Sequence, residues 1–173
     1  MSKKTIMTPL SDGLVRQALG NDTRIIKYSE LKNYETIDDL LPTINSFFII
    51  LLEEEMNSGH WTCMFRTPTG YYYFNSYGQK YDVDISVIPM CIRKILGEDK
   101  REITRLLDGK TCEWNNTKLQ GDKSQVCGRW CILCISMCCM MGYSPDDFIK
   151  FIKDKSKELG KSCDEIVAKF VNI

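Results

Sequence analysis

The centre of the chain reads His60-Trp61-Thr62-Cys63-Met64-Phe65-Arg66, then Thr67-Pro68-Thr69-Gly70, then Tyr71-Tyr72-Tyr73-Phe74-Asn75. Apolar and aromatic residues dominate the first and last segments, whereas Pro68 and Gly70 are typical of a tight turn. The pattern therefore predicts a β-hairpin. Because the chain reverses direction at the turn, the start of the first strand and the end of the second share one edge. We expect His60 and Asn75 to lie together at that edge.

The segments around this hairpin extend it into a small sheet. Ile44–Leu52 is rich in β-branched and aromatic residues, which predicts a strand buried on both faces. The acidic run Glu53–Glu55, followed by Asn57-Ser58-Gly59, predicts the loop that joins this strand to the hairpin. Thr111–Thr117 is expected to form a further strand.

Helices are predicted on both sides of the hairpin in the chain. Near the amino terminus, Ser11 or Asp12 is a capping residue, apolar residues follow at helical spacing, and Gly20 is a stop signal. A second helical segment covers Asp82–Leu96. It is interrupted or begun near Pro89, because proline has no backbone N–H and breaks the interior of a helix but is tolerated in its first turn.

The carboxyl-terminal half adds three more helices. Cys127–Met141 is almost entirely apolar, which predicts a buried central helix. Ser144 and Pro145 are a strong helix start, with a capping side chain followed by proline at the first helical position. Ser162 precedes a similar start. The expected fold class is α+β, with a small mixed sheet flanked by helices in a single domain covering residues 1–173.

Composition excludes several classes of protein. Lysine plus arginine and aspartate plus glutamate each number 23, so no overall field draws the chain to nucleic acid or to an anionic membrane. Met1-Ser2-Lys3-Lys4 is followed by no apolar stretch of signal-peptide length. The apolar runs Phe47–Leu52 and Trp130–Tyr143 are too short to span a bilayer. We therefore expect a soluble protein that is not secreted and does not bind a membrane.

The chain has nine cysteines, an odd number, and five of them lie between residues 127 and 139. Residues three or four apart on one helix point along the same face and cannot readily cross-link. The spacing predicts reduced thiols in a reducing compartment, most of them acting as small apolar residues.

Cys127 differs from the others because it lies at the predicted first turn of the central helix. A free thiol has a pKa of about 8.5, and a helix amino terminus lowers that value and favours the thiolate nucleophile. The unpaired amides of this turn, with Gly128 allowing close backbone approach, are suited to binding an oxyanion. Cys127 is therefore a candidate nucleophile.

A base for this nucleophile must be His60, because the chain has one histidine. Asn75 can orient the ring by accepting its other N–H through the amide oxygen. Gln120, seven residues before Cys127, can offer its amide N–H as a second oxyanion donor, and Gln125 competes for that role. Together these residues predict cysteine protease chemistry.

Three blocks, His60-Trp61, Tyr73–Gly78 and Gln120–Gly128, resemble the adenovirus maturation protease and its relatives in large DNA viruses, virophages and mobile elements. The SUMO-processing proteases are more distantly similar. The resemblance runs in order from about Phe47 to Tyr143, and the block that ends in Cys-Gly is its most specific part.

The resemblance implies a papain-like fold in which Cys127 is the nucleophile, His60 the base, Asn75 the orienting residue and Gln120 the oxyanion donor. It implies cleavage of viral capsid or core precursors, often after Gly-Gly or Gly-X-Gly, in the virion or in the virus factory of the host cytoplasm. No cofactor is implied. Relatives commonly have Glu or Asp in place of Asn75, although papain-like proteases work with asparagine. The neutral net charge argues against activation by DNA, and an activating peptide is not carried over.

Other functions fit parts of the sequence. A protease acting on ubiquitin-like modifiers would share the same chemistry. An inactive relative would keep the fold as a binding module, although all the chemical groups are present. The C-x3-C-x2-C spacing at Cys127, Cys131 and Cys134 matches iron–sulfur sites of radical enzymes, but the chain is too short for a complete barrel. Zinc knuckles of paired Cys-x2-Cys are missing.

Overall fold

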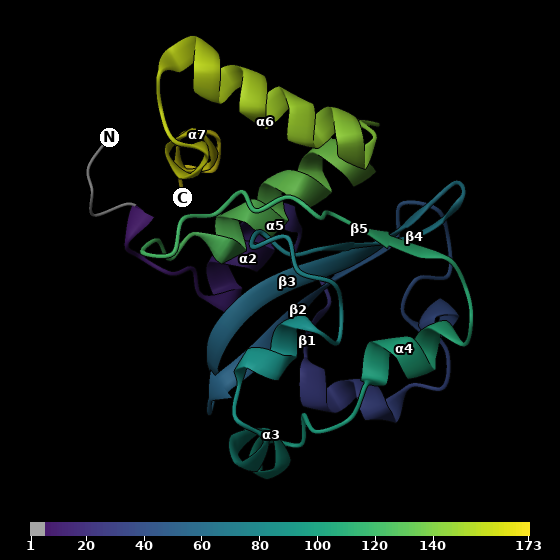
Figure 1. Ribbon diagram of the computed structural model, residues 1–173. Helices are drawn as coiled ribbons and strands as arrows, with labels where there is room; N and C mark the ends of the chain where they lie inside the picture. The colour runs from purple at the N-terminus through teal and green to yellow at the C-terminus, as the bar shows by residue number, and fades with distance from the viewer. Residues whose placement is uncertain (1–5) are drawn as a thin grey trace.

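The computed structural model describes residues 6–173, which form a five-stranded sheet with helices on both faces (Figure 1). The start Met1–Lys4, expected to carry no signal peptide, lies outside these residues. The strands, in their order across the sheet, are β1 (Ile25–Lys27), β2 (Phe47–Glu55), β3 (Ser58–Thr67), β4 (Gly70–Phe74) and β5 (Cys112–Trp114). The two outer pairs are parallel and the two inner pairs antiparallel. The α+β class and the small mixed sheet are thereby confirmed.

Helices are distributed over both faces of the sheet (Figure 1). One face is covered by α2 (Asp12–Leu19), α5 (Cys127–Ile135), α6 (Pro145–Leu159) and α7 (Cys163–Phe170). The other face is covered by α3 (Met90–Leu96), α4 (Glu102–Leu107) and the 3-10 segments η1 (Tyr28–Asn33), η2 (Ile37–Asp39) and η3 (Asp84–Val87). Among residues 6–173, no helix has both the length and the apolar character needed to cross a bilayer.

Strand β2 lies between two hydrophobic cores. Ile49 and Leu51 face the core under α5, whereas Phe48, Ile50 and Leu52 face the core on the side of α4. Alternate residues of a strand point to opposite faces, so a continuous apolar run is what burial on both faces requires. Each such side chain contributes roughly 1.5–3 kcal/mol by leaving water. The predicted double-sided burial of this strand is confirmed.

Helix α5 is the buried central helix expected from the sequence. All nine of its residues are buried, and Trp130 packs against Phe74 of β4 and Phe148 of α6. The α-helical part ends at Ile135 and continues as a π-helical turn, η4 (Ser136–Met140). The helix begins at Cys127, as predicted.

The boundaries of β2 were predicted wrongly at both ends. Ile44 is exposed and the strand begins at Phe47, while the predicted loop Glu53–Glu55 belongs to the strand. The chain can turn within two residues because Asn57 adopts a positive φ of 60°. The Glu53 side chain is buried and pairs with Lys27 at 3.2 Å, which explains how an acidic residue is accommodated there.

Strand β1 and helix α4, like the 3-10 segments η1 and η2, have no counterpart in the sequence prediction. Strand β1 has three residues and exists through its parallel pairing with β2. Helix α4 has no local cap. Instead the buried carboxylate of Asp82, twenty residues upstream, accepts from the backbone N and Oγ1 of Thr104 at 2.7 and 2.6 Å. Asp82 itself has a positive φ of 62° and is not helical. Of the two options for Asp82–Leu96, a helix begun near Pro89 is confirmed.

The other helix starts follow their predicted caps. Ser11 caps α2, Ser144 caps α6 with proline at the first helical position, and Ser162 caps α7. The predicted strand Thr111–Thr117 is shorter than expected, since only Cys112–Trp114 pairs with β4.

The buried carboxylate of Asp164 ties α7 to the centre of the molecule. It accepts from the indole Nε1 of Trp130 at 2.9 Å and from the backbone N of Gly121 at 2.9 Å. Gly121 belongs to the loop that leads into α5. The carboxyl-terminal helix therefore holds both the central helix and the segment before it.

Replacing Asp164 by Ala is expected to lower the free energy of unfolding by about 2–3 kcal/mol, because it leaves a buried indole N–H and a backbone N–H without an acceptor. Urea unfolding followed by tryptophan fluorescence measures the change. Asp154→Ala on α6 is the control, since this exposed carboxylate makes only a 3.9 Å ion pair with Lys150, and its effect should be within about 0.5 kcal/mol. Equal losses in the two variants would contradict the anchoring role.

Candidate functional site

His60 and Asn75 meet at the edge of the central hairpin, as the sequence predicts. His60 lies near the start of β3, and Asn75 directly follows β4. The Nε2 atom of His60 lies 3.0 Å from the Asn75 Oδ1. An amide oxygen only accepts hydrogen bonds, so Nε2 carries the ring proton in the neutral imidazole. The Nδ1 atom is therefore the ring nitrogen that can accept a proton.

Asn75 is fully buried and is held at every polar atom. Its backbone N donates to Asn115 Oδ1 at 2.9 Å, and its backbone O accepts from Asn115 Nδ2 at 2.6 Å. Its side-chain Oδ1 also accepts from the Tyr77 backbone N at 2.9 Å, and its Nδ2 donates to Asp84 Oδ2 at 2.9 Å. Asn75 is thus both the turn residue after β4 and the partner of the imidazole.

Cys127 is the first residue of α5 and is buried, with 8% of the residue exposed. The backbone N–H groups of Trp61 and Gly128 and that of Cys127 itself lie close enough to the sulfur to lower the pKa of the thiol. Trp61 directly follows His60 in β3. The packing of α5 on β3 therefore brings the sulfur beside the segment that carries the imidazole. Within residues 6–173, no direct hydrogen bond joins the Cys127 thiol to the His60 ring.

Burial controls the charge of both groups. It raises the pKa of Cys127 above its usual value and outweighs the three backbone N–H groups. It also lowers the pKa of His60 to about 4, although the bond to Asn75 works in the opposite direction. The expected lowering of the thiol pKa at the helix start is therefore corrected. At neutral pH the pair is a thiol and a neutral imidazole, not an ion pair.

Gln120 is buried and its amide has a fixed orientation. Its Oε1 accepts from Ser76 Oγ at 2.7 Å, and its Nε2 donates to the Ser124 backbone O at 2.9 Å. The second N–H of the amide points toward the Tyr77 hydroxyl at 3.4 Å, a distance at which a hydrogen bond is weak. Gln125, the alternative for the oxyanion role, is exposed.

Tyr77 contacts three of the four residues that the sequence singled out, since its backbone N–H also donates to Asn75 Oδ1. Its ring stacks on the His60 ring with centroids 4.8 Å apart, and its hydroxyl faces Gln120. Burial is the main cause that raises the pKa of Tyr77. Tyr77 was not assigned a role from sequence, although it lies within the Tyr73–Gly78 block.

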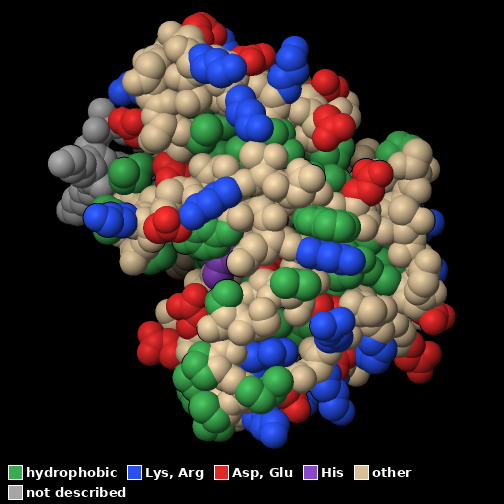
Figure 2. Space-filling model, in the orientation of Figure 1, with side chains coloured by type: hydrophobic (Ala, Val, Ile, Leu, Met, Phe, Trp, Pro, Cys, Tyr) green, Lys and Arg blue, Asp and Glu red, His purple; other side chains and the backbone are tan. Residues whose placement is uncertain are grey.

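The His60 ring lies in a recess of the surface. Figure 2 shows the one histidine side chain, in purple, in a notch between the two halves of the molecule, with acidic side chains nearby. A cavity of about 50 Å³ adjoins it and is lined partly by His60, Asn75, Tyr77 and Asp84. Asp84 was also missed from sequence, because nothing in the chain marks its contact with Asn75 across nine residues.

All nine cysteines are free thiols. Cys127, Cys131 and Cys134, whose spacing resembles an iron–sulfur motif, lie within α5 and not on a loop. Cys131 and Cys134 are buried against Cys63 of β3. Within the described part of the chain, no group of three His, Cys, Asp or Glu side chains is placed to hold a metal ion.

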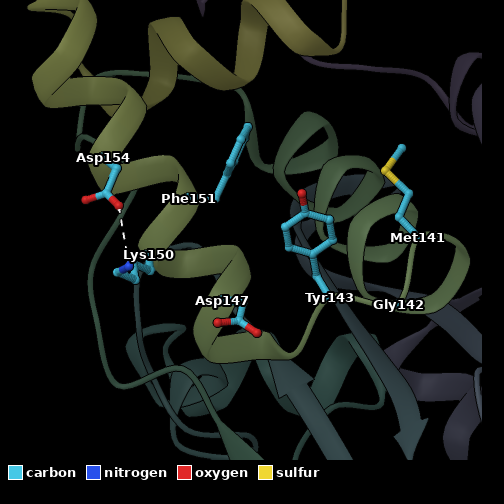
Figure 3. A pocket seen from close by; sticks show the side chains of 7 residues that line it. All are labelled: Met141, Gly142, Tyr143, Asp147, Lys150, Phe151 and Asp154. Carbon is cyan, nitrogen blue, oxygen red and sulfur yellow. Dashed lines mark ion pairs between the residues drawn. The ribbon is translucent and has the colours of Figure 1, made fainter.

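A larger pocket lies elsewhere, where η4 is followed by α6 (Figure 3). Its volume is about 450 Å³, and its lining includes Met141, Tyr143 and Phe151 together with the ion pair between Lys150 and Asp154. None of the four candidate residues lines it. The much smaller recess beside His60 is lined by His60 and Asn75, whereas Cys127 and Gln120 do not line it.

No family model matches the chain. The chain is 31% identical over 163 residues to a protein of Sputnik virophage described as uncharacterized protein V9, and the match covers 91% of each chain. The similarity therefore includes the sheet, the central helix and the segments that carry His60, Asn75, Gln120 and Cys127. The chain belongs to the same family as this virophage protein V9.

Proposed function

We propose that the chain is a papain-like cysteine endopeptidase in which Cys127 is the nucleophile and His60 the general base. The observation that carries the proposal is the 3.0 Å contact between His60 Nε2 and Asn75 Oδ1, which leaves Nδ1 as the proton acceptor at the edge where α5 begins. The same arrangement of nucleophile, imidazole and orienting group occurs in unrelated hydrolases, where it performs acyl transfer.

Acylation begins when His60 Nδ1 takes the proton of the Cys127 thiol as the sulfur attacks the substrate carbonyl carbon. The carbonyl π electrons move to the oxygen, which becomes an oxyanion. When the carbonyl re-forms, the carbon–nitrogen bond breaks and the departing amine takes the proton from His60. The product is a thioester on Cys127. Because thiol and imidazole are both neutral beforehand, substrate binding must bring them into hydrogen-bonding contact, as is common for catalytic groups.

The oxyanion needs donors that are already in place. The N–H of Cys127 at the helix start is one, and the second N–H of Gln120, which makes only the 3.4 Å contact with Tyr77, is the other. In deacylation, water gives a proton to His60 Nδ1 while its oxygen attacks the thioester. The sulfur leaves and recovers the proton, which restores the enzyme.

The proposed substrates are viral precursor polypeptides of the capsid or core. The resemblance of the three sequence blocks to the adenovirus maturation protease supports this class, and the relative from a virophage is in keeping with a viral setting. On the same resemblance, cleavage after Gly-Gly or Gly-X-Gly is proposed, in the virion or the virus factory. A peptide library gives the cleavage motif. Assays on whole ubiquitin-like modifiers and on capsid precursors then separate an isopeptidase from a maturation protease.

Cys127→Ala is expected to lower peptide cleavage roughly a thousandfold or more, because no other group replaces the nucleophile. The assay uses a peptide library that includes Gly-Gly and Gly-X-Gly sequences, and circular dichroism checks the fold. Cys91→Ala is the control, since this thiol is exposed on α3, and it should leave turnover unchanged. Retained cleavage in Cys127→Ala would refute the assignment.

Alkylation by iodoacetamide tests the charge state of the resting site. Since burial raises the pKa of Cys127, its alkylation rate should rise about tenfold per pH unit between pH 6 and 8, because only the thiolate reacts. Mass spectrometry of the Cys127 peptide measures the rate, and the exposed Cys91 should be labelled first at pH 7. A rate that does not change over this range would indicate an ion pair instead.

Gln120→Ala should lower kcat about a hundredfold while KM changes little, since an oxyanion donor acts mainly in the transition state. Gln125→Ala provides the matched control, because this glutamine lies in the same loop but is exposed. If the two variants have the same turnover, Gln120 is not an oxyanion donor.

A further inference from the structure

The carboxyl group of Asp84 lies behind Asn75, on the side away from the imidazole. Asp84 is 3% exposed and begins η3. Its Oδ2 accepts from Asn75 Nδ2 at 2.9 Å and from the Tyr73 hydroxyl, and its Oδ1 accepts from the Ile85 backbone N at 2.9 Å. The contacts form one chain of hydrogen bonds from Asp84 through the Asn75 amide to His60 Nε2.

Only one assignment of donors and acceptors fits this series of hydrogen bonds. A carboxylate only accepts, so the end of the Asn75 amide that faces Asp84 must be its NH2 group. The opposite end, which faces His60 Nε2 and the Tyr77 backbone N–H, is therefore the oxygen. If the amide turned over, its oxygen would face the carboxylate and its NH2 would face the Tyr77 N–H. Asp84 thus keeps the ring proton on Nε2 and leaves Nδ1 free.

The negative charge of Asp84 has a second effect. When His60 takes the proton of Cys127, an imidazolium forms next to an amide that carries no charge. The carboxylate on the far side of that amide polarises it and attracts the imidazolium. A charge placed one side chain away from the ring therefore supplies part of what a directly bonded Asp or Glu would supply.

The same contact explains why asparagine, and not an acid, occupies position 75. An aspartate there would place its carboxylate against that of the equally buried Asp84, at hydrogen-bonding distance. Two carboxylates this close cannot both be ionised. Asn75 and Asp84 therefore complement each other: the amide contacts the imidazole, and the carboxylate lies one side chain farther from the ring.

We infer that Asp84 is a positioning residue of the site, which holds the Asn75 amide in the orientation that keeps the His60 proton on Nε2 and supports the imidazolium during catalysis. This inference rests on the proposed peptidase function. The tautomer of His60 is nevertheless measurable without any activity, so the two proposals fail separately.

The first test is the 15N NMR spectrum of tag-free protein labelled at histidine, in which His60 is the one imidazole. The wild-type protein at pH 7 should show a protonated, pyrrole-like Nε2 and an unprotonated, pyridine-like Nδ1. Asp84→Asn should shift both signals toward the values of a mixture of tautomers, because an amide at position 84 no longer prevents Asn75 from turning over. A proton on Nδ1 in the wild-type protein would overturn the inference, even if the variant failed to fold.

The second test is the exchange of the two side chains. We expect Asp84→Asn and Asn75→Asp each to lower kcat/KM roughly tenfold to a hundredfold, since each upsets the positioning of the base. The double variant Asn75→Asp/Asp84→Asn should recover most of the loss, because an amide at position 84 can donate to the carboxylate at position 75 while the Tyr73 hydroxyl turns to accept. Additive losses in the double variant would contradict the coupling.

Tyr73→Phe is the matched control. It removes one hydrogen bond from the same Asp84 oxygen but keeps the charge and the contact with Asn75. The His60 tautomer should be unchanged and kcat/KM should stay within a few-fold of the wild-type value. If Tyr73→Phe and Asp84→Asn have the same effect on the tautomer and on kcat/KM, Asp84 has only a structural role.

The pH profile gives a further readout. Burial raises the pKa of Asp84 to about 6, and the neighbouring Asp82 charge adds to the shift, while Tyr73, Asn75 and the Ile85 N–H work against it. Because the charged form supports the imidazolium, kcat/KM of the wild-type protein should fall as pH drops through about 6. In Asp84→Asn this decline should move to lower pH, toward the pKa of His60. An unchanged profile in an active variant would overturn the inference but leave the peptidase function standing.

Discussion

The packing of α5 against β3 is the contact on which the site depends. It brings the start of the helix close to the strand: a Cβ at Gly128 would lie 3.5 Å from the Trp61 ring, an ordinary van der Waals contact, and 3.3 Å from Leu10, which is tighter. The close approach places the Cys127 sulfur against the backbone of Trp61, one residue from the imidazole. Helix and strand belong to one hydrophobic core, so the energy that folds the domain also assembles the reactive groups.

This burial has an electrostatic consequence. The surroundings that hold Cys127 and His60 in place also favour their uncharged forms, and the pKa values of the thiol and the imidazole move apart. Before substrate binds, a site of this kind contains no ion pair between thiolate and imidazolium. The reactivity that we propose for it depends on fixed hydrogen-bond donors and acceptors, namely the amides of Asn75 and Gln120 and the backbone N–H groups at the start of α5. Asp84 and Ser76 fix the orientation of those two amides.

The carboxyl-terminal helices contribute to the same arrangement from outside it. Asp164 on α7 holds the loop before α5. Arg129, buried in the first turn of the helix, donates to the backbone O atoms of Thr8, Val171 and Ile173 and so links both ends of the described chain to the central helix. The similarity to the virophage protein V9 covers 91% of each chain. It therefore includes the central helix that these supports hold and the segments that carry the reactive residues.

Local patterns in the sequence determined the hairpin, the double-sided strand, the helix caps and the start of the central helix, because these depend on alternation, turn residues and capping side chains within a few positions. They also brought His60 and Asn75 to one edge. Only the tertiary structure decided the short strand β1, the capping of α4 by Asp82, and the contacts of Tyr77 and Asp84 with the site. It also reversed the expected direction of the pKa shift of Cys127. Burial and hydrogen bonds between distant segments set these features, and neither is encoded in the spacing of neighbouring residues.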